Sequence, residues 1–346
     1  MDNPITQSKE WKKLQDDLGE TSFLVSEADF HYLAILRSTP VGKYLHLPYG
    51  PVAKDESSFK AALQSLNALA SSTRAFFIRI EPQNTAIALP PGAHKSKDQS
   101  PAETWLLDLP GKKPLNHKDD EMFTDLESIP PELKAKLPSR LLRYYRTAGK
   151  KGITIERSHN PADIHYLLDL QKALGREKGI STFSESYLQT ELKQPFATLY
   201  LFRLNEEGKE SPVPEKPSTT AKSTADASAA DSDSPVIAAG LVFDHGATRY
   251  NLQGAQSDAG RRLHATGILT IQLILDAYSL GLKTFDFWGI APDGAPADHP
   301  WAGFTAFKKT FMGHERKYHG TYDLILSPIK YKIYTLLRHL NRIIKH

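Results

Sequence analysis

The sequence predicts an α/β protein made of two related units, and three observations lead to this prediction. In each half, a stretch with helical spacing of apolar residues precedes a short turn and a strand-like run: residues 58–71 precede RAFFIRIEP, and residues 265–280 precede KTFDFWGI. Each half carries further strand-like runs upstream of its helix. The length of 346 residues leaves room for about two domains.

The first domain is expected to occupy residues 1–148. Its upstream strand-like runs are HYLAILRS and KYLHLPYG, and a polar loop leads from RAFFIRIEP to a further apolar run, TWLLDL. The segment that follows predicts one helix, which begins after Pro130 and Pro131 and reaches a turn at Gly149 or Gly152. The domain junction is placed at this turn.

The second domain is expected to occupy residues 149–320, with ATLYLFRL and VIAAGLVF as strands upstream of its helix. Gly281 is the expected C-terminal cap of that helix. Between the two strands, residues 206–235 contain one large apolar residue, Val213, and no aromatic residue. Such a composition cannot bury enough surface to offset its ordering entropy, so it predicts a disordered insert within the domain.

The C-terminal segment, residues 321–346, is expected to form a strand and a helix that pack back on the first domain. Its apolar residues recur at helical spacing while its basic residues lie largely off this stripe; they are Ile329, Ile333, Leu336, Leu337, Leu340, Ile343 and Ile344. Two interpretations of the stripe stay open. It covers a core, or it contacts an anionic membrane.

Composition excludes several classes of protein. The chain contains no cysteine, which rules out disulfides, thiolate metal sites and a cysteine nucleophile. Its 13 histidines include no HExxH motif, so no metal site is predicted. No apolar run reaches the ~18 residues of a membrane span, and the N-terminus resembles no signal peptide. We therefore expect a cytoplasmic location, with peripheral contact at the inner face of the membrane left open.

The charge is unevenly distributed although the net charge is only +3. Between Trp301 and His346, nine basic residues face two acidic ones. Between Lys134 and Arg157, eight basic residues face one acidic residue, Glu156. These two zones are either solvated helix faces or surfaces for an anionic partner.

Three regions carry candidate functional residues. After the predicted strand KTFDFWGI, a loop rich in glycine and proline leads to Phe307 and Lys308, where a lysine beside aromatic rings can stabilise an oxyanion or hold a phosphate. In STPVGKYLHLPYGPV, a proline-fixed turn at Tyr49 lies near Arg37 and Lys43, an arrangement that suits an anionic ligand. Asp108 is a single carboxylate at the end of TWLLDL.

The third region begins at Arg249 and Tyr250 and continues into SDAGRRLHATG. GNAT acetyltransferases hold the pyrophosphate of coenzyme A with an Arg/Gln-x-x-Gly-x-Gly/Ala loop at a helix start. The nearest match here begins at Arg262 and has Ala265 in place of the first glycine. The degraded loop argues against an acyl-CoA substrate.

These motifs together resemble the Fem (FemABX) family of peptidoglycan bridge-forming aminoacyltransferases. The resemblance rests on S-x-x-W at the N-terminus, KYLHLPYGP, FFIRIEP, TWLLDL, R-x-x-R-x-A-x-K-x-G, DFWGI and GFTAFKKTFMG, which extend over nearly the whole chain. It implies two GNAT-like domains in tandem. It also implies that an amino acid of the glycine, alanine or serine type passes from aminoacyl-tRNA to the side-chain amine of a peptidoglycan precursor peptide.

The resemblance carries the family's catalytic pair over to Phe307 and Lys308. It implies aminoacyl-tRNA as co-substrate and no further cofactor, and a lipid- or nucleotide-linked muropeptide as acceptor. The residues expected to bind substrate are Arg37, Lys43, Tyr49, Asp108, Arg249 and Tyr250. The sequence departs from the family in having no coiled-coil arm, and in having Met312 where glycine is usual. A coenzyme-A-dependent N-acyltransferase and a non-catalytic module that binds tRNA or muropeptide stay open as alternatives.

Overall fold

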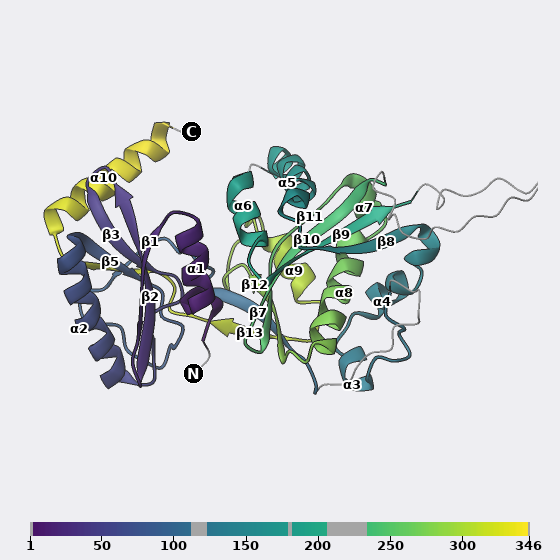
Figure 1. Cartoon of the computed structure of the whole chain (residues 1–346), viewed down its shortest axis with the longest axis horizontal. Helices are drawn as coiled ribbons and strands as arrows, with labels where there is room; N and C mark the ends of the chain where they lie inside the picture. The colour runs from purple at the N-terminus through teal and green to yellow at the C-terminus, as the bar shows by residue number, and fades with distance from the viewer. Residues whose placement is uncertain (1–2, 112–122, 179–181, 206–233, 345–346) are drawn as a thin grey trace, which may run out of the picture. The chain divides into compact units, whose positions relative to one another are not determined.

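The computed structural model describes residues 3–111, 123–178, 182–205 and 234–344 (Figure 1). The predicted disordered insert lies outside the described residues except for its last two positions. The chain forms two compact units: unit 1 comprises Met1–Leu107, Asp286–Lys309 and Gly313–His346, and unit 2 comprises Asp108–Phe285 and Thr310–Met312. The chain therefore leaves unit 1 at Asp108, not at the predicted boundary after residue 148. It also returns to unit 1 at Asp286, so a single boundary cannot describe the division.

Unit 1 is built on a mixed sheet with the strand order β1-β2-β3-β5-β14-β6, in which β4 also pairs with β2. Its strands are β1 (Thr21–Ser26), β2 (Phe30–Thr39), β3 (Gly42–Leu47), β4 (Val52–Ala53), β5 (Ala75–Ile80), β6 (His94–Lys95) and β14 (Tyr322–Ile325). Strands β3 and β5 are parallel, and the other pairs are antiparallel.

Unit 1 also contains three strands in the order β13-β7-β12, and its helices flank these sheets. The strands are β7 (Glu103–Asp108), β12 (Thr284–Gly289) and β13 (His314–Lys317). The helical segments are η1 (Ile5–Gln7), α1 (Lys9–Asp17), α2 (Glu56–Thr73), α9 (Ala302–Lys308) and α10 (Pro328–Ile344). The last residue of β7 and the first two residues of β12 belong to unit 2.

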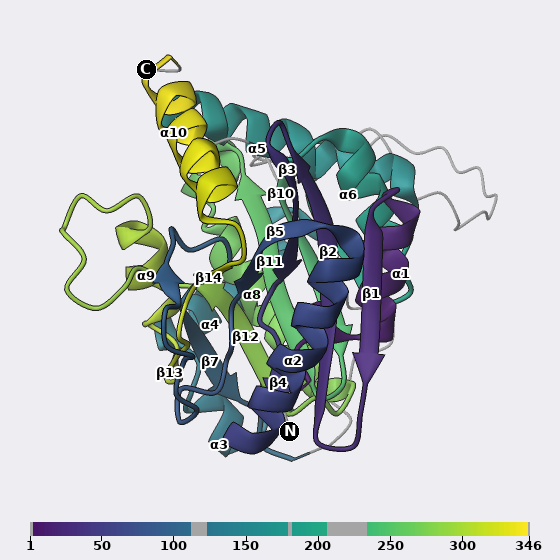
Figure 2. The same cartoon turned by 90° about the vertical axis from the view of Figure 1, so that its left-hand side faces the viewer.

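Helix α2 begins at a reciprocal side-chain cap. The Ser58 amide donates to the Asp55 carboxylate at 2.9 Å, and the Asp55 amide donates to the Ser58 hydroxyl at 3.0 Å. These bonds satisfy amides near the start of the helix, where none has a partner within the helix. Figure 2 shows α2 lying across the strands of the sheet, where Leu66 enters the core beside Leu45 and Ile78. The helix extends two residues beyond the predicted range at each end.

Unit 2 combines an antiparallel sheet, in the order β8-β9-β10-β11, with helices. Its strands are β8 (Ile153–Ser158), β9 (Ala197–Leu204), β10 (Val236–His245) and β11 (Thr248–Gln256). Its helical segments are α3 (Pro131–Lys134), α4 (Ser139–Arg146), η2 (Gly149–Lys151), η3 (Pro161–Asp163), α5 (Ile164–Lys178), α6 (Glu185–Leu192), α7 (Asp258–Arg262) and α8 (Ala265–Ser279).

The predicted single helix after Pro130 and Pro131 is wrong. Two helices, α3 and α4, occupy this segment because Pro138 interrupts it. Proline has no amide to continue the hydrogen-bond ladder, and its ring clashes with the preceding turn. Its carbonyl accepts the Leu142 amide at 3.0 Å, so the same residue begins α4. The predicted turn is present at Gly152, whose φ is +71°.

Helix α8 is buried along nearly its whole length, and its polar side chains are paired inside the unit. The Asp276 carboxylate accepts hydrogen bonds from Arg157, from the Tyr200 hydroxyl at 2.8 Å and from the Gln272 amide at 2.8 Å. Such hydrogen bonds offset the free energy that is lost when polar groups are removed from water. Gly281 follows the helix with a φ of +80°, the left-handed conformation that ends many helices.

The C-terminal strand and helix belong to unit 1. Strand β14 pairs with β5 in antiparallel register. Helix α10 rests on the sheet through Tyr331 and Tyr334, whose rings lie 5.3 Å from that of Phe77. Tyr331 also donates its hydroxyl proton to Asp323 of β14 at 2.8 Å. The helix is therefore attached by two aromatic side chains on one of its faces.

Candidate active site

Lys308 is the last residue of α9, and its side chain reaches the end of β12. The Nζ atom donates a hydrogen bond to the Gly289 carbonyl at 2.6 Å. The side chain is half-buried, and burial lowers the pKa of Lys308 to about 8, with the charge of Asp286 acting in the opposite direction. An amine with this pKa exchanges a proton readily near neutral pH. The lysine is thus held by a strand-end carbonyl rather than by an ion pair on the surface.

Asp286 is the acidic group beside this lysine, and it is not among the predicted site residues. The side chain is 4% exposed and accepts hydrogen bonds from the Thr104 hydroxyl and from the Trp288 amide at 2.7 Å. Burial raises the pKa of Asp286 to about 6, although these bonds and the charges of Lys308 and Arg316 oppose the rise. A signal was present in the sequence, because an aspartate between two phenylalanines of a buried strand needs a partner.

Trp288, two residues after Asp286, and Tyr49, whose ring contacts that of Trp288, have left-handed backbone conformations. Trp288 has a φ of +66° and Tyr49 a φ of +57°, although large side chains rarely adopt such values. Their rings meet edge to face with centroids 5.5 Å apart, and the ring of Tyr318 lies 5.2 Å from that of Tyr49. The Tyr49 hydroxyl donates to the Pro101 carbonyl at 3.0 Å. Backbone strain of about 1–3 kcal/mol per residue is typical of functional sites.

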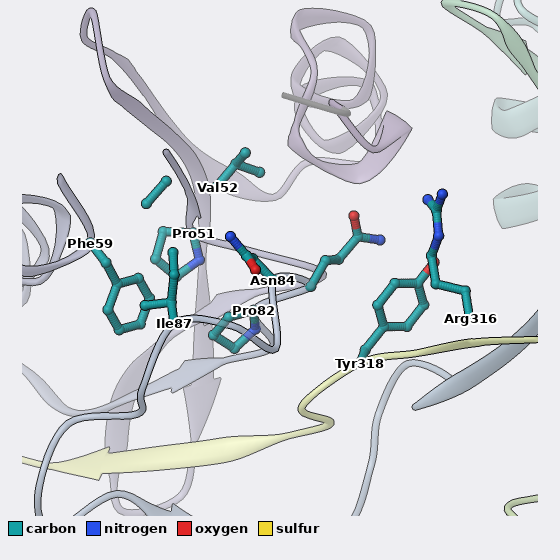
Figure 3. Close-up of a pocket in the computed structure, with 10 residues that line it drawn as sticks. Pro51, Val52, Phe59, Pro82, Asn84, Ile87, Arg316 and Tyr318 are labelled. Atoms are coloured by element: carbon teal, nitrogen blue, oxygen red, sulfur yellow. The ribbon is translucent and has the colours of Figure 1, made fainter. Parts of the chain in front are cut away.

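A pocket of about 260 Å³ opens in unit 1 next to this aromatic cluster. Figure 3 shows Arg316 and Tyr318 at one end of the pocket and Phe59 and Ile87 at the other. Tyr318 packs on Tyr49, and the charge of Arg316 acts on Asp286. Arg316 and Tyr318 therefore line the pocket and also interact with residues around Lys308.

The other predicted site residues of unit 1 lie in different surroundings. Phe307 precedes Lys308 on α9 and is half-buried. Arg37 of β2 forms an ion pair with Glu20. Lys43 of β3 is exposed in the same hairpin, paired in register with Ser38. Of the predicted residues of unit 1, Tyr49 has a ring that contacts Trp288, near Lys308.

In unit 2, Arg249 lies inside the fold. Its side chain is 1% exposed, and it donates to the Asp244 carboxylate at 2.6 and 2.7 Å and to the Leu273 carbonyl at 3.0 Å. This placement does not fit the predicted role of Arg249 in binding substrate, because the guanidinium is occupied by protein groups. Tyr250 is also buried, and Asp108 is exposed while its carbonyl accepts a hydrogen bond from Lys136 at 2.7 Å.

Residues 204–339, which include Asp286, Trp288 and Lys308, match the model of the FemAB family. The predicted resemblance to the Fem family is confirmed. A crystal structure of FemX superposes on the chain with a TM-score of 0.69 and 17% identity, covering 95% of this chain and 94% of that chain. At this identity the likeness shows the fold. The predicted α/β class is therefore confirmed.

Two further solved structures resemble this Fem-like chain. L-PGS from Bacillus licheniformis has a TM-score of 0.50 and 14% identity, and the match covers 99% of both chains. The C-terminal domain of a putative lysylphosphatidylglycerol synthetase from Agrobacterium fabrum has a TM-score of 0.52 and 12% identity, covering 95% of this chain and 90% of that one. Comparison with curated protein sequences gives no match.

The described residues contain neither a membrane-spanning helix nor a cluster of metal-ligating side chains. In these parts of the chain, no helix combines the length and the apolar character needed to cross a bilayer. In the same parts, no three histidine or carboxylate side chains gather in a way that could hold a metal ion.

Replacing Asp286 by asparagine is expected to stabilise the protein at neutral pH. Asparagine keeps an oxygen that accepts from Thr104 and Trp288, and it removes a buried charge. Since folding raises the pKa of Asp286 from 3.8 to about 6, the variant should gain about 2–3 kcal/mol in free energy of unfolding near pH 8. The wild type recovers this stability as pH falls through about 6, so the difference should vanish below about pH 4.

Urea unfolding of both proteins at several pH values measures this difference. A pH-independent difference, or a variant less stable than the wild type near pH 8, would contradict the buried-charge interpretation.

Proposed function

We propose that the chain is a Fem-type aminoacyltransferase that moves an amino acid from aminoacyl-tRNA to the side-chain amine of a peptidoglycan precursor peptide. The observation that carries the proposal is Lys308, held half-buried at the end of β12 with a pKa lowered to about 8. It lies within the stretch that matches the FemAB family, at the position implied for the family's catalytic lysine.

The reaction would be aminolysis of an ester. The acceptor amine attacks the ester carbonyl, a C–N bond forms, the C–O bond to the ribose breaks, and the amine proton passes to the ribose oxygen. The ester is already activated, so a covalent enzyme nucleophile is not needed. Lys308 would stabilise the oxyanion with its charge or supply a proton to the leaving ribose oxygen. Asp286 would hold part of the lysine population in the charged form.

The acceptor would bind in the pocket of unit 1. Its lining combines the apolar Phe59 and Ile87 with the polar Asn84 and Arg316, which suits a ligand carrying both peptide and anionic groups. The aromatic cluster of Tyr49, Trp288 and Tyr318 would lie between this ligand and Lys308.

A basic and aromatic patch on unit 2 supports tRNA as the donor. The ring of Tyr144 stacks on His264 with centroids 4.0 Å apart. Three exposed cations surround this ring: Arg140 and Arg143 lie 5.6 Å from its centroid, and Lys151 lies 5.8 Å from it. Cations that neutralise phosphates, beside rings that can stack on bases, are the combination that single-stranded nucleic acid ends require.

The same region argues against coenzyme A. The amide of Thr266, in the first turn of α8, donates to the side chain of Gln256 at 3.2 Å. His264 precedes the helix with a φ of +58° and is covered on one face by Tyr144. A pyrophosphate needs free amides at the start of a helix. Here the amide of Thr266 already donates a hydrogen bond to the side chain of Gln256.

Reversing two charges of the patch should weaken tRNA binding. Replacing Arg140 and Arg143 by glutamate is expected to lower affinity for charged tRNA at least about tenfold and to reduce the salt dependence of binding by about two counterions. A matched double reversal at Lys12 and Lys13 on α1 serves as control. Filter binding over a range of salt concentrations measures both effects, and equal losses in the two variants would contradict a specific tRNA surface.

The proposed activity is tested by incubating the protein with a muropeptide precursor and a mixture of charged tRNAs and weighing the product. A mass increase of one or more amino acid residues is expected. Transfer from an acyl-coenzyme A, with none from any charged tRNA, would overturn the proposal in favour of an acyl-CoA-dependent enzyme. Binding of the precursor without any product would favour a non-catalytic module.

A further inference from the structure

Helix α10 presents a row of large apolar side chains to solvent. Ile329 is 77% exposed and Leu336 is 58% exposed. Ile333, Leu337 and Leu340 are exposed as well. At 3.6 residues per turn these five positions fall on one face of the helix. Of the two interpretations left open by the sequence, a stripe that covers a core does not hold for these five residues.

The opposite face of α10 holds the helix to unit 1. Tyr334 is buried against Phe76 and Phe77, and Tyr331 lies one turn earlier on the same side. The Arg338 guanidinium lies 5.5 Å from the centre of the Tyr334 ring. The helix packs on its own sheet through this face. The exposed apolar face is therefore available to contact another surface.

The charge around the exposed face has one sign. Lys330 borders the apolar row on one side, and Lys332 borders it on the other together with His339, as the helical period requires. From Leu324 to the C-terminus the sequence has five lysines and arginines and no aspartate or glutamate. An apolar row with a purely basic border complements a surface that is apolar inside and anionic outside.

We propose that α10 docks on an anionic phospholipid bilayer, lying in the interface with its apolar row among the acyl chains. Such a helix gains affinity from buried apolar area and from attraction of its lysines to acidic headgroups. Tyr331 and Tyr334 keep the helix on unit 1 while it binds, so the whole protein is held at the membrane surface. The proposal is independent of the function proposed above, because it uses no residue of the Lys308 site.

The absence of cysteine from the chain makes a site-specific test straightforward. Leu336→Cys in the full-length protein is labelled with an environment-sensitive fluorophore. Leu280→Cys, at a residue 62% exposed in unit 2, is the matched control. With vesicles containing about 30% phosphatidylglycerol in phosphatidylcholine, the label at position 336 should shift to the blue, and the label at 280 should not. Vesicles of phosphatidylcholine alone should produce a much smaller shift.

A triple variant separates docking from folding and from catalysis. Ile333→Gln, Leu336→Gln and Leu340→Gln together should lower the fraction of protein that sediments with anionic vesicles at least about tenfold. Its melting temperature should stay near that of the wild type, because the three side chains are exposed. Transfer to a water-soluble, nucleotide-linked precursor, if the proposed function holds, should also be retained.

Two results would overturn the proposal. The first is a blue shift of equal size with neutral and anionic vesicles, or none with either. The second is a shift that grows with protein concentration in the absence of vesicles and is accompanied by dimers in light scattering, since a second copy of the chain would then cover the face.

Discussion

Replacing Lys308 by alanine is expected to lower the rate of aminoacyl transfer about 100- to 1000-fold, the loss typical of removing one preorganised oxyanion donor. The ammonium of Lys308 is held at the Gly289 carbonyl at the end of β12, and alanine removes this charge. The variant should lose kcat while the dissociation constant of the precursor changes little, because the role proposed for the lysine is at the reacting atoms. Single-turnover kinetics with charged tRNA, together with calorimetry of precursor binding, separate the two quantities.

Lys309→Ala is the matched control for this experiment. Lys309 is the next residue in the chain and is exposed, with its ammonium 5.6 Å from the centre of the Trp105 ring. An exposed cation over a ring contributes little, so this variant should retain nearly wild-type transfer. If the rate of transfer by Lys308→Ala stays within about tenfold of the wild-type rate, the proposed role of the lysine is contradicted.

Replacing Asp323 by alanine is expected to destabilise unit 1 by about 3–5 kcal/mol. Both oxygens of this buried carboxylate are engaged by Arg79, at 2.7 and 2.8 Å, and the two side chains are almost fully buried. Alanine would leave the guanidinium, which lies 5.4 and 5.3 Å from the ring centres of Tyr44 and Phe77, without its countercharge. It would also remove the acceptor of the Tyr331 hydroxyl, and with it one attachment of α10. Urea unfolding followed by circular dichroism measures the loss.

Asp17→Ala tests whether burial causes this effect. Asp17 pairs with Lys13 at 2.6 Å on the exposed surface of α1, where such a pair contributes about 0.5 kcal/mol or less. Replacing Arg79 and Asp323 together by leucine or methionine should recover much of the loss, because no charge is then left buried. Similar losses for Asp17→Ala and Asp323→Ala would contradict the buried-pair interpretation.

The stability gain expected for Asp286→Asn and the activity loss expected for Lys308→Ala have a common origin, since the two side chains are neighbouring charged groups at the end of β12. A buried carboxylate and a half-buried ammonium both lie in surroundings that oppose their charges. The left-handed backbone of Trp288 adds strain at the same strand end. Removing the carboxylate should therefore make the fold more stable and the lysine less often charged. Functional sites often reduce the stability of the fold, because they keep charged or strained groups in surroundings that oppose them.

Elements whose signal is local could be predicted from the sequence. Helices α2 and α8 and strands β5 and β12 follow from apolar spacing and from glycine or side-chain caps, which depend on neighbours within a few residues. The position of Lys308 after a strand end was also visible, because the loop and the aromatic residues beside it are contiguous in the sequence. Pro138 was a local signal as well. It divides the predicted helix into α3 and α4.

The tertiary structure alone decided which distant residues meet. Arg79 and Asp323 are 244 positions apart, and Thr104 and Asp286 are 182 positions apart, so no periodicity relates them. The basic character of Arg249 suggested a ligand contact, but its burial beside Asp244 gives the charge an internal partner. The apolar row of α10 has the same spacing whether it covers a core or faces solvent. Only the packing of Tyr331 and Tyr334 on β5 fixes which face is free, because burial is a property of the whole fold and not of the repeat.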